Sequence, residues 1–151
     1  MLYKTMIRTV MTYGCEAWTL TVRDAETIDR FERRVLRRIL GPVREGSIWR
    51  IRHNEEIYSL LDVPKLSTHI RLLRLQWAGH VQRMPDTRVP KRIFAGNPGG
   101  RRRVGRPRLR WMDGVSGDAL ELLGVRNWRS IAEDRVMWRQ MIGEAKARYG
   151  L

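Results

Sequence analysis

Hydrophobic residues recur along this chain mainly at intervals of three and four, the spacing that places them on one face of an α-helix. Glycine, proline or a capping residue separates the runs, as is typical of helix ends. The stretches that fit this pattern are residues 2–13, 22–40, 54–63, 67–84, 107–123 and 128–145. The pattern therefore predicts an all-α chain, a small helical domain of about five to six helices.

Three of these stretches carry an apolar stripe that should face a core. The stripes comprise Ile28, Phe31, Val35 and Ile39; Ile70, Leu73, Trp77, Val81 and Met84; and Ile131, Trp138, Met141, Ile142 and Ala145. Arg71 and Arg74 fall outside the second stripe. Core packing is the expected role of Trp77 and Trp138, although a tryptophan can also stack on a nucleic-acid base. For His80 we expect a structural, hydrogen-bonded role.

Three stretches depart from the helical pattern. Residues 43–53 are expected to form a loop, and residues 89–94 a short extended segment. Residues 97–100, with the sequence Asn-Pro-Gly-Gly, indicate a turn or a flexible hinge. We therefore divide the chain into a helical region at 1–95, a basic flexible hinge at 96–106 and a C-terminal helical pair at 107–151. The hinge has little to bury and is expected to be mobile without nucleic acid.

The net charge of +14 is concentrated in one stretch of the chain. Residues 65–111 hold thirteen Lys and Arg and one acid, whereas residues 112–151 hold six of each sign. Such segregated positive charge is typical of a protein that binds nucleic acid. Contacts from Lys and Arg to phosphates release counterions, so the affinity is mostly independent of base sequence. The sequence therefore predicts RNA and/or DNA as the partner.

The densest basic segment runs from Arg88 to Arg110, with nine Lys and Arg and no acid. Its glycines let the backbone approach a phosphate, and each arginine offers a two-pronged set of donors. The candidate nucleic-acid-binding residues are Arg71, Arg74, Lys91, Arg92, Arg101, Arg102, Arg103, Arg106, Arg108 and Arg110. Gly105-Arg106-Pro107 also resembles the core of minor-groove AT-hooks, although Val104 stands where such hooks have arginine. The alternative is a solvated linker between helices.

No motif for catalysis, metal binding or cofactor binding stands out. Cys15 is the single cysteine, and the three histidines cannot join it in any zinc-finger spacing. A phosphate-binding Walker loop and the sequence context of an activated nucleophile are both missing. The acids are scattered, whereas a polymerase pairs aspartates to hold two metal ions. We therefore expect no catalytic residue, no metal and no cofactor, and no enzymatic activity from the chain on its own.

The cellular compartment can be inferred from the lengths of the apolar runs and from the cysteine content. The apolar runs are too short to span a membrane, and the N-terminal stretch lacks a secretory signal. A lone cysteine fits a reducing compartment. We expect an intracellular protein, in nucleus and cytoplasm, with no membrane partner.

Several longer segments together suggest a family. They are YKTMIRTVMTYGCEAW at residues 3–18, FERRVLRRI at 31–39, LRLQWAGHVQRM at 73–84, GRPRLRW at 105–111 and NWR at 127–129. In this order they resemble the C-terminal part, thumb and post-thumb, of the endonuclease–reverse transcriptases of non-LTR (LINE-like) retrotransposons. The resemblance covers essentially the whole chain.

The resemblance implies a parent enzyme that performs RNA-directed DNA polymerisation primed at nicked target DNA. In that family an endonuclease precedes fingers and palm, and the thumb follows. Residues 1–95 would be the thumb-like region, and the palm aspartates have no matching positions in this chain. The implied role of this piece is to hold template RNA, primer–template duplex or target DNA, with the upstream palm as a protein partner. Some related elements end in a zinc knuckle, which a single cysteine cannot form.

Two alternatives remain open at this point. The chain could be a host-adopted, stand-alone DNA- or RNA-binding module, which a defined sequence preference would support. It could also be an inert interaction fragment whose apolar faces normally pack on the missing palm. A monomer with little exposed apolar surface would count against the second alternative.

Arginines of the hinge are predicted to supply much of the affinity. The hinge set is Arg101, Arg102, Arg103 and Arg106, and the control set from the charge-balanced tail is Arg129, Arg135, Arg139 and Arg148. Alanine at the hinge set should flatten the log–log salt dependence of binding by roughly three units, because each lost phosphate contact removes about one. Stability should hardly change, since exposed arginines contribute little to it. Equal weakening by both sets would show that binding follows total charge.

Overall fold

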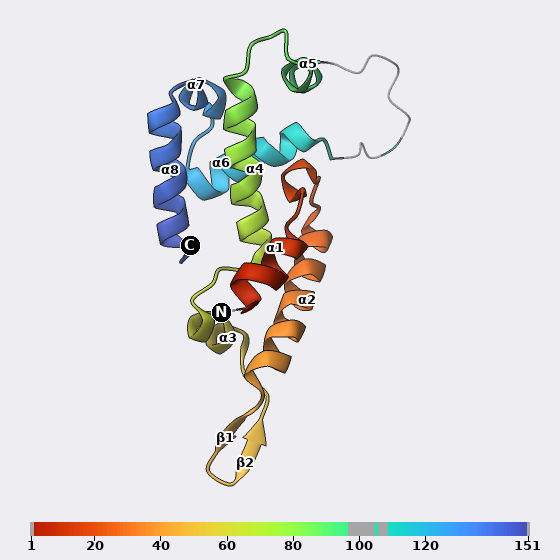
Figure 1. Ribbon diagram of the computed structural model, residues 1–151, viewed down its shortest axis with the longest axis vertical. Coiled ribbons are helices and arrows are strands. Elements are labelled where there is room, and N and C mark those ends of the chain that lie inside the picture. Colours follow the sequence, from red (N-terminus) through yellow and green to blue (C-terminus); the bar gives the residue numbers. More distant parts are fainter. Residues whose placement is uncertain (1, 97–104, 106–108, 151) are drawn as a thin grey trace.

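The computed structural model describes residues 2–96, 105 and 109–150 (Figure 1). Within that part the chain is mainly helical, which confirms the all-α class, with one short antiparallel sheet. The elements are η1 (Tyr3–Ile7, π-helical), α1 (Arg8–Met11), η2 (Cys15–Ala17, 3-10), α2 (Val22–Leu40), β1 (Val43–Glu45), β2 (Ile48–Arg50), α3 (Asn54–Leu61), α4 (Leu66–Gln82), α5 (Val89–Ala95), α6 (Trp111–Leu123), α7 (Trp128–Glu133) and α8 (Arg135–Arg148). No described helix is both long enough and apolar enough to cross a bilayer.

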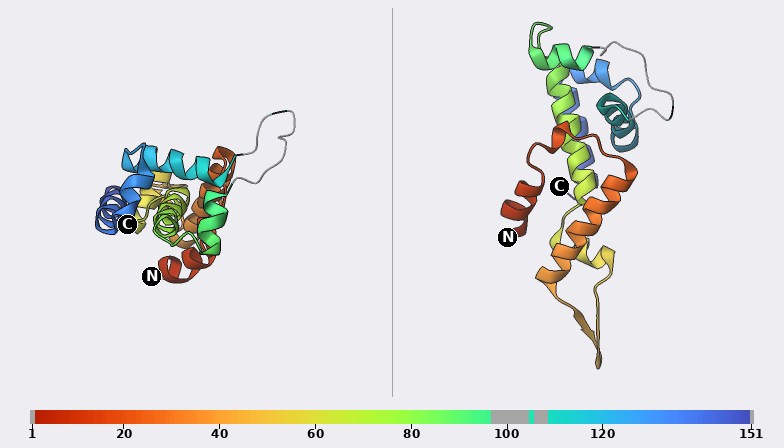
Figure 2. Two further views of the ribbon diagram at one scale, coloured as in Figure 1. Left: turned by 90° about the horizontal axis from the view of Figure 1, so that it is seen from above. Right: turned by 90° about the vertical axis from the view of Figure 1, so that its right-hand side faces the viewer.

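Helix α4 forms the centre of the molecule. It contacts α6, α7 and α8 on one side and η2 and α2 on another, and α5 lies against its C-terminal end (Figures 1 and 2). The main core cluster comprises Leu72, Leu75, Ala78, Val115, Ala119, Leu122, Trp128, Ala132, Trp138, Ile142 and Ala145. A helix packed on several sides cannot have a single apolar stripe. Trp138 is buried as predicted, but the core role predicted for Trp77 is wrong, since its side chain is 37% exposed.

Helix α2 buries only part of the predicted stripe: Ile28 and Val35 pack against the core, and the other two residues do not. Phe31 and Ile39 are each 49% exposed, whereas Leu36 and the carboxylate-bearing Glu32 are fully buried. Glu32 accepts hydrogen bonds from the hydroxyl of Tyr3 and from the backbone N–H of Leu66. Desolvation by burial raises the pKa of Glu32 above its usual range. The polar face of α2 therefore enters the fold because its acids have partners there.

Those partners lie at the N-terminus of α4, which is capped by another helix. Asp29 accepts hydrogen bonds from the backbone N–H and the hydroxyl of Ser67, at 2.9 and 2.8 Å, and Glu32 accepts from Leu66 N–H at 2.8 Å. The helix begins at Leu66, with Lys65 as an N-cap that makes no side-chain bond. The helix predicted over 67–84 thus begins one residue earlier, and Ser67 lies inside its first turn. Carboxylates from α2 satisfy the free N–H groups and complement the helix dipole.

The predicted loop at residues 43–53 contains a β-hairpin. Val43 pairs with Arg50 and Glu45 with Ile48, so Gly46 and Ser47 form a two-residue turn. Gly46 has φ of 60°, which suits the first central position of such a turn. The strands are short and lie mostly exposed at one end of the molecule (Figure 1).

Residues 89–94, predicted as extended, belong to helix α5. Pro90 lies in its first turn, where the missing N–H costs nothing. Phe94 packs edge-on against Trp111 and Trp128, with ring centroids 5.6 and 6.1 Å apart. These two ring contacts, with residues far away in the sequence, fix the position of α5.

The last predicted helix is interrupted at Asp134. Its carboxylate accepts hydrogen bonds from the backbone N–H of Val136 and Met137, so α8 begins separately from α7. Helix α6 ends at Leu123, as predicted for the stretch 107–123, and Gly124 follows in the left-handed conformation. The hinge predicted at 96–106 lies outside the described residues except for Gly96 and Gly105, as do Pro107 and Arg108.

Gly79 lets α8 approach α4 closely. A Cβ atom at this position would lie 2.0 Å from Nε1 and 2.4 Å from Cδ1 of Trp138. The same indole nitrogen donates a hydrogen bond to the carbonyl of Leu75, at 3.2 Å. The tryptophan thus fills the space that the glycine leaves and binds the backbone of α4.

Replacing Gly79 by alanine is expected to destabilise the protein by about 1–3 kcal/mol, because the methyl group displaces Trp138. The matched control is Gly143→Ala in α8, where a Cβ atom meets nothing within 4 Å. Alanine there should stabilise by roughly 0.5–1 kcal/mol through helix propensity. Urea unfolding curves of the two variants measure both effects. Stabilisation by Gly79→Ala would contradict the close packing of α4 and α8.

Candidate nucleic-acid interface

Two of the predicted phosphate-binding arginines are engaged inside the fold. Arg71 lies 2.5 Å from Asp118 through Nε and 2.5 Å from Glu121 through Nη2. Arg74 is 2% exposed and donates to Asp118 through Nε, at 2.8 Å, and through Nη2. Both therefore join α4 to α6, and the surface position inferred for Arg74 from the apolar stripe is wrong. We remove the pair from the candidate interface.

The surroundings of Arg74 are shaped to hold a guanidinium. Its Nη1 donates to the backbone carbonyl of Trp18, at 3.1 Å, which adds the segment after η2 to the network. A Cβ atom at Gly114 would come within 3.0 Å of the same Nη1. Gly114, which weakens helix α6 by its low propensity, thus makes room for the ion pair.

The remaining candidates divide between described and undescribed residues. Arg92 and Arg110 are exposed, whereas Lys91 is half-buried and donates to the carbonyl of Gln82. Helix α5 places Lys91 and Arg92 beside the end of α4. The other candidates lie outside the described residues; they are Arg101, Arg102, Arg103, Arg106 and Arg108. Their predicted role stays a prediction.

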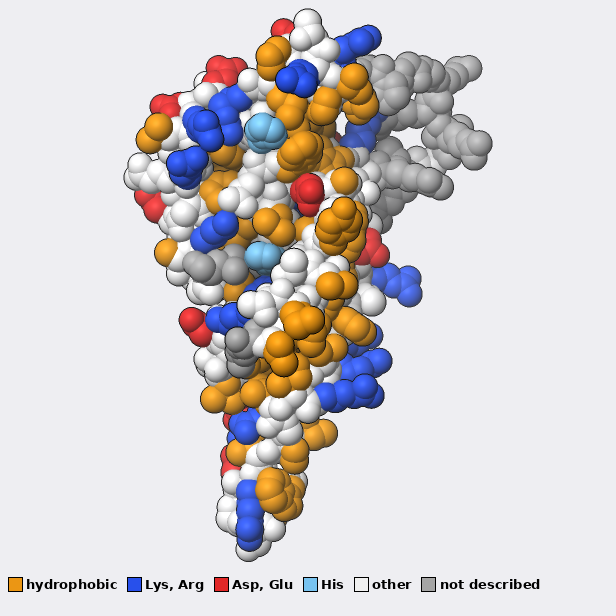
Figure 3. All heavy atoms as spheres, viewed as in Figure 1, with side chains coloured by type: hydrophobic (Ala, Val, Ile, Leu, Met, Phe, Trp, Pro, Cys, Tyr) orange, Lys and Arg blue, Asp and Glu red, His pale blue; other side chains and the backbone are white. Residues whose placement is uncertain are grey.

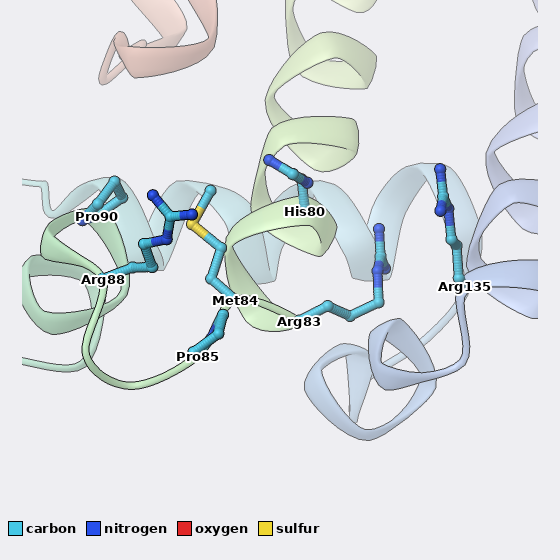
Figure 4. A pocket seen from close by; sticks show the side chains of 7 residues that line it. All are labelled: His80, Arg83, Met84, Pro85, Arg88, Pro90 and Arg135. Carbon is cyan, nitrogen blue, oxygen red and sulfur yellow. The ribbon is translucent and has the colours of Figure 1, made fainter.

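The structure adds a basic cavity that the sequence did not indicate. It has a volume of about 620 Å³ and lies where α4, α5 and α8 meet. Its lining residues, which define the basic cavity, are His80, Arg83, Met84, Pro85, Arg88, Pro90 and Arg135 (Figure 4). Figure 4 shows Arg83 and Arg135 side by side on one side of His80, with Arg88 and Met84 on the other. Among the residues that the structure describes, no acidic side chain lines this cavity.

Positive charge in the basic cavity is not neutralised by a protein partner. Arg83 donates through Nη1 to the carbonyl of Ala132 at 2.5 Å, which orients its guanidinium and leaves other N–H groups unused. Desolvation, followed by the nearby charges of Arg135 and Arg139, lowers the pKa of Arg83. Within the described part of the chain, Arg88 and Arg135 form no ion pair or hydrogen bond through their side chains. Mutual repulsion of this kind favours the binding of an anion.

A second basic surface follows α2, which we call the α2 groove. Arg30, Arg34 and Arg38 are four residues apart and therefore share one helix face. The groove has a volume of about 410 Å³ and is lined by Arg30, Arg34, Arg37, Arg38, Gly41, Pro42, Ile51 and Arg52. Arg37 and Arg52 are partly engaged, donating to Asn54 and to the carbonyl of Gly41. Basic side chains gather along this edge of the molecule in Figure 3.

Sequence reasoning could have found only one of these surfaces. The spacing of Arg30, Arg34 and Arg38 was visible as a helical face of like charges. The basic cavity combines residues from the end of α4, the start of α5 and the start of α8, and no local pattern links them. Arg135 and Arg139, which the charge balance of the tail suggested as a control, lie beside Arg83 and are unsuitable for that purpose. Among the described residues, no group of three or more His, Cys, Asp or Glu side chains is placed to hold a metal ion.

The buried ion pair between Arg74 and Asp118 should matter for folding and leave the salt dependence of binding unchanged. Arg74→Met should destabilise by less than Asp118→Leu, because Asp118 keeps Arg71 as a partner. Asp118→Leu should destabilise by about 3–5 kcal/mol, because the buried guanidinium of Arg74 is left without a carboxylate. The double variant should recover most of that loss, since apolar side chains can replace a buried pair. Thermal unfolding of the four proteins measures the coupling.

The same variants test whether Arg74 contacts phosphate. Any of them that folds should keep the wild-type salt slope of nucleic-acid binding. A stable Arg74→Met protein whose slope is smaller by about one would instead place Arg74 at a phosphate.

Comparison with known proteins finds one similarity of note. The chain is 28% identical, over 146 residues, to an uncharacterized transposon-derived protein of Caenorhabditis elegans. The match covers 93% of this chain and 52% of the relative, so the chain spans about half the length of the curated relative it matches. No family model matches, and no solved structure matches. The similarity indicates that the chain has a transposon origin.

Proposed function

We propose that this chain is the nucleic-acid-binding C-terminal part of a retrotransposon reverse transcriptase that lacks the catalytic palm. The observation that carries the proposal is the basic cavity, which Arg83, Arg88 and Arg135 line with no acid among its described lining residues. Transposon origin and the segments that resemble the thumb end of such enzymes support the same assignment. The role proposed for the chain is to bind, and the chemistry belongs to the part it lacks.

Phosphodiester is the anion that fits these observations best. Guanidinium groups donate in pairs to phosphate oxygens, and Arg83 and Arg135 lie side by side in the cavity, with Arg88 across it on the other side of His80 (Figure 4). The α2 groove offers a further row of guanidiniums spaced along a helix. A polyanion with regularly spaced charges can occupy both surfaces, and release of its counterions supplies the free energy.

A second role is supported by the apolar residues at the start of the chain. Leu2, Val10 and Tyr13 are 73%, 77% and 88% exposed. Figure 3 shows hydrophobic side chains gathered over η1, α1 and α2. Exposed apolar patches of this kind favour a protein partner. We propose the upstream part of the enzyme as that partner, since the relative is about twice as long as this chain.

The binding test replaces Arg88 and Arg135 by alanine, leaving Arg83 in place because it holds α7. If both arginines meet phosphates, the log–log salt slope should fall by about 1.4 on single strands and by about 1.8 on duplex. Fluorescence anisotropy with labelled RNA and DNA over a salt series measures the slope. Stability should stay close to wild type, because neither side chain has a protein partner to lose.

The matched control replaces Arg23 and Arg44, which removes the same charge elsewhere. Arg23 is exposed at the start of α2, and Arg44 bonds only the carbonyl of Gly46 in its own hairpin. The hairpin lies at the opposite end of the molecule from α5 (Figure 1). An equal loss of slope in the control would show that the phosphate contacts are not concentrated in the basic cavity. Absence of binding by the wild-type chain at low salt would overturn the proposed function.

A further inference from the structure

An aromatic cleft adjoins the basic cavity and shares one residue with it. The cleft has a volume of about 310 Å³ and is lined by Glu16, Leu73, Gln76, Trp77 and His80. His80 also lines the basic cavity, so the two hollows lie next to each other along α4 and share this residue. Figure 3 shows a histidine at the upper end of this face, with basic side chains on one side and hydrophobic ones on the other.

The exposed ring of Trp77 is held in place and accessible. Its centroid lies 5.5 Å from that of His80, with the two ring planes at 47°. Trp77 is 37% exposed and lines the cleft. Part of its ring is therefore accessible from the cleft, and the rest is covered by the protein. Neighbouring η2 is fixed to α6, since Trp111 donates through Nε1 to the carbonyl of Glu16 at 2.8 Å. The cleft is therefore a preformed feature of the fold.

We infer that the aromatic cleft and the basic cavity together bind one nucleotide of a single strand, with its base on Trp77 and its phosphate among Arg83, Arg88 and Arg135. This inference rests on the proposed nucleic-acid binding. A nucleotide joins a flat apolar ring to an anion, and the protein offers an exposed aromatic ring next to an unneutralised cluster of cations.

The charges of the lining residues determine the orientation in which the nucleotide binds. Glu16 lines the cleft and repels a phosphate, while its carboxylate and the amide of Gln76 can accept hydrogen bonds from the edge of a base. The basic cavity holds cations alone among its charged lining residues. The phosphate therefore belongs on the arginine side of His80 and the base on the Trp77 side.

The proposed stacking on Trp77 requires an unpaired base, so the strand is single. In a duplex the base is stacked and paired, so its face cannot meet a protein ring without being flipped out. A single strand offers unstacked bases to aromatic side chains at little cost, whatever the base. RNA and DNA share this chemistry, so both are used as probes.

The test compares wild type with Trp77→Ala and Trp77→Phe on four probes: oligouridylate, oligodeoxythymidylate, a duplex, and polyphosphate as a polyanion without bases. Trp77→Ala should weaken both single strands roughly 5- to 100-fold, with little change for duplex or polyphosphate. The salt slope should stay at the wild-type value, because no phosphate contact is lost. Trp77→Phe should restore most of the affinity. Trp49→Ala, on the distant hairpin, is the matched control for removal of an exposed tryptophan.

Two readouts keep the test informative if the alanine variant unfolds. Oligouridylate should quench the tryptophan fluorescence of the wild type more than polyphosphate does, and Trp77→Phe should remove that difference. Equal binding of single strands by wild type and a folded Trp77→Ala would overturn the base-stacking site, as would quenching that Trp77→Phe leaves unchanged. Either result leaves the proposed function standing if the wild type still binds nucleic acid, whereas loss of all binding by the wild type overturns both.

Discussion

The ion pair of Arg74 with Asp118 is the interaction on which the arrangement of helices depends. It is almost fully buried and joins α4, α6 and the segment after η2, three parts of the chain far apart in sequence. Two charges in an apolar core are costly unless each is paired and hydrogen-bonded. The observed packing of α6 on α4 satisfies both, so we infer that the pair selects this packing more than it adds stability.

The basic cavity and the aromatic cleft both depend on this packing of α6 on α4. Once α6 is fixed on α4, its partners α7 and α8 close the core, with Trp138 against Gly79. Arg135 then begins α8 beside Arg83, and η2 stands beside Trp77. The backbone around the cavity and the cleft is therefore set by packed helices, whereas the side chains of Arg88 and Arg135 are exposed and have no described partner that holds them.

Local signals in the sequence predicted local structure well. The stretches predicted over 22–40 and up to residue 123 match α2 and the end of α6, because a capping box of Thr21 and Asp24 starts the first helix and Gly124 ends the second. The two-residue turn at Gly46 was also visible, and a search for Gly-Ser between β-branched and aromatic residues would have found the hairpin.

The features that sequence reasoning missed arise from contacts between distant residues. Arginine on a helix is expected at the surface, and no residue near Arg74 in the sequence indicates that Asp118 is its partner. In the same way, the carboxylates that cap α4 come from a different helix, α2. For the same reason, the charge counted along the chain predicted the candidate interface only in part. Two arginines in the most basic stretch serve the fold, while Arg135 from a neutral stretch faces an unpaired cation cluster. What draws a polyanion is the charge that lacks a partner, and only the packing decides which charges those are.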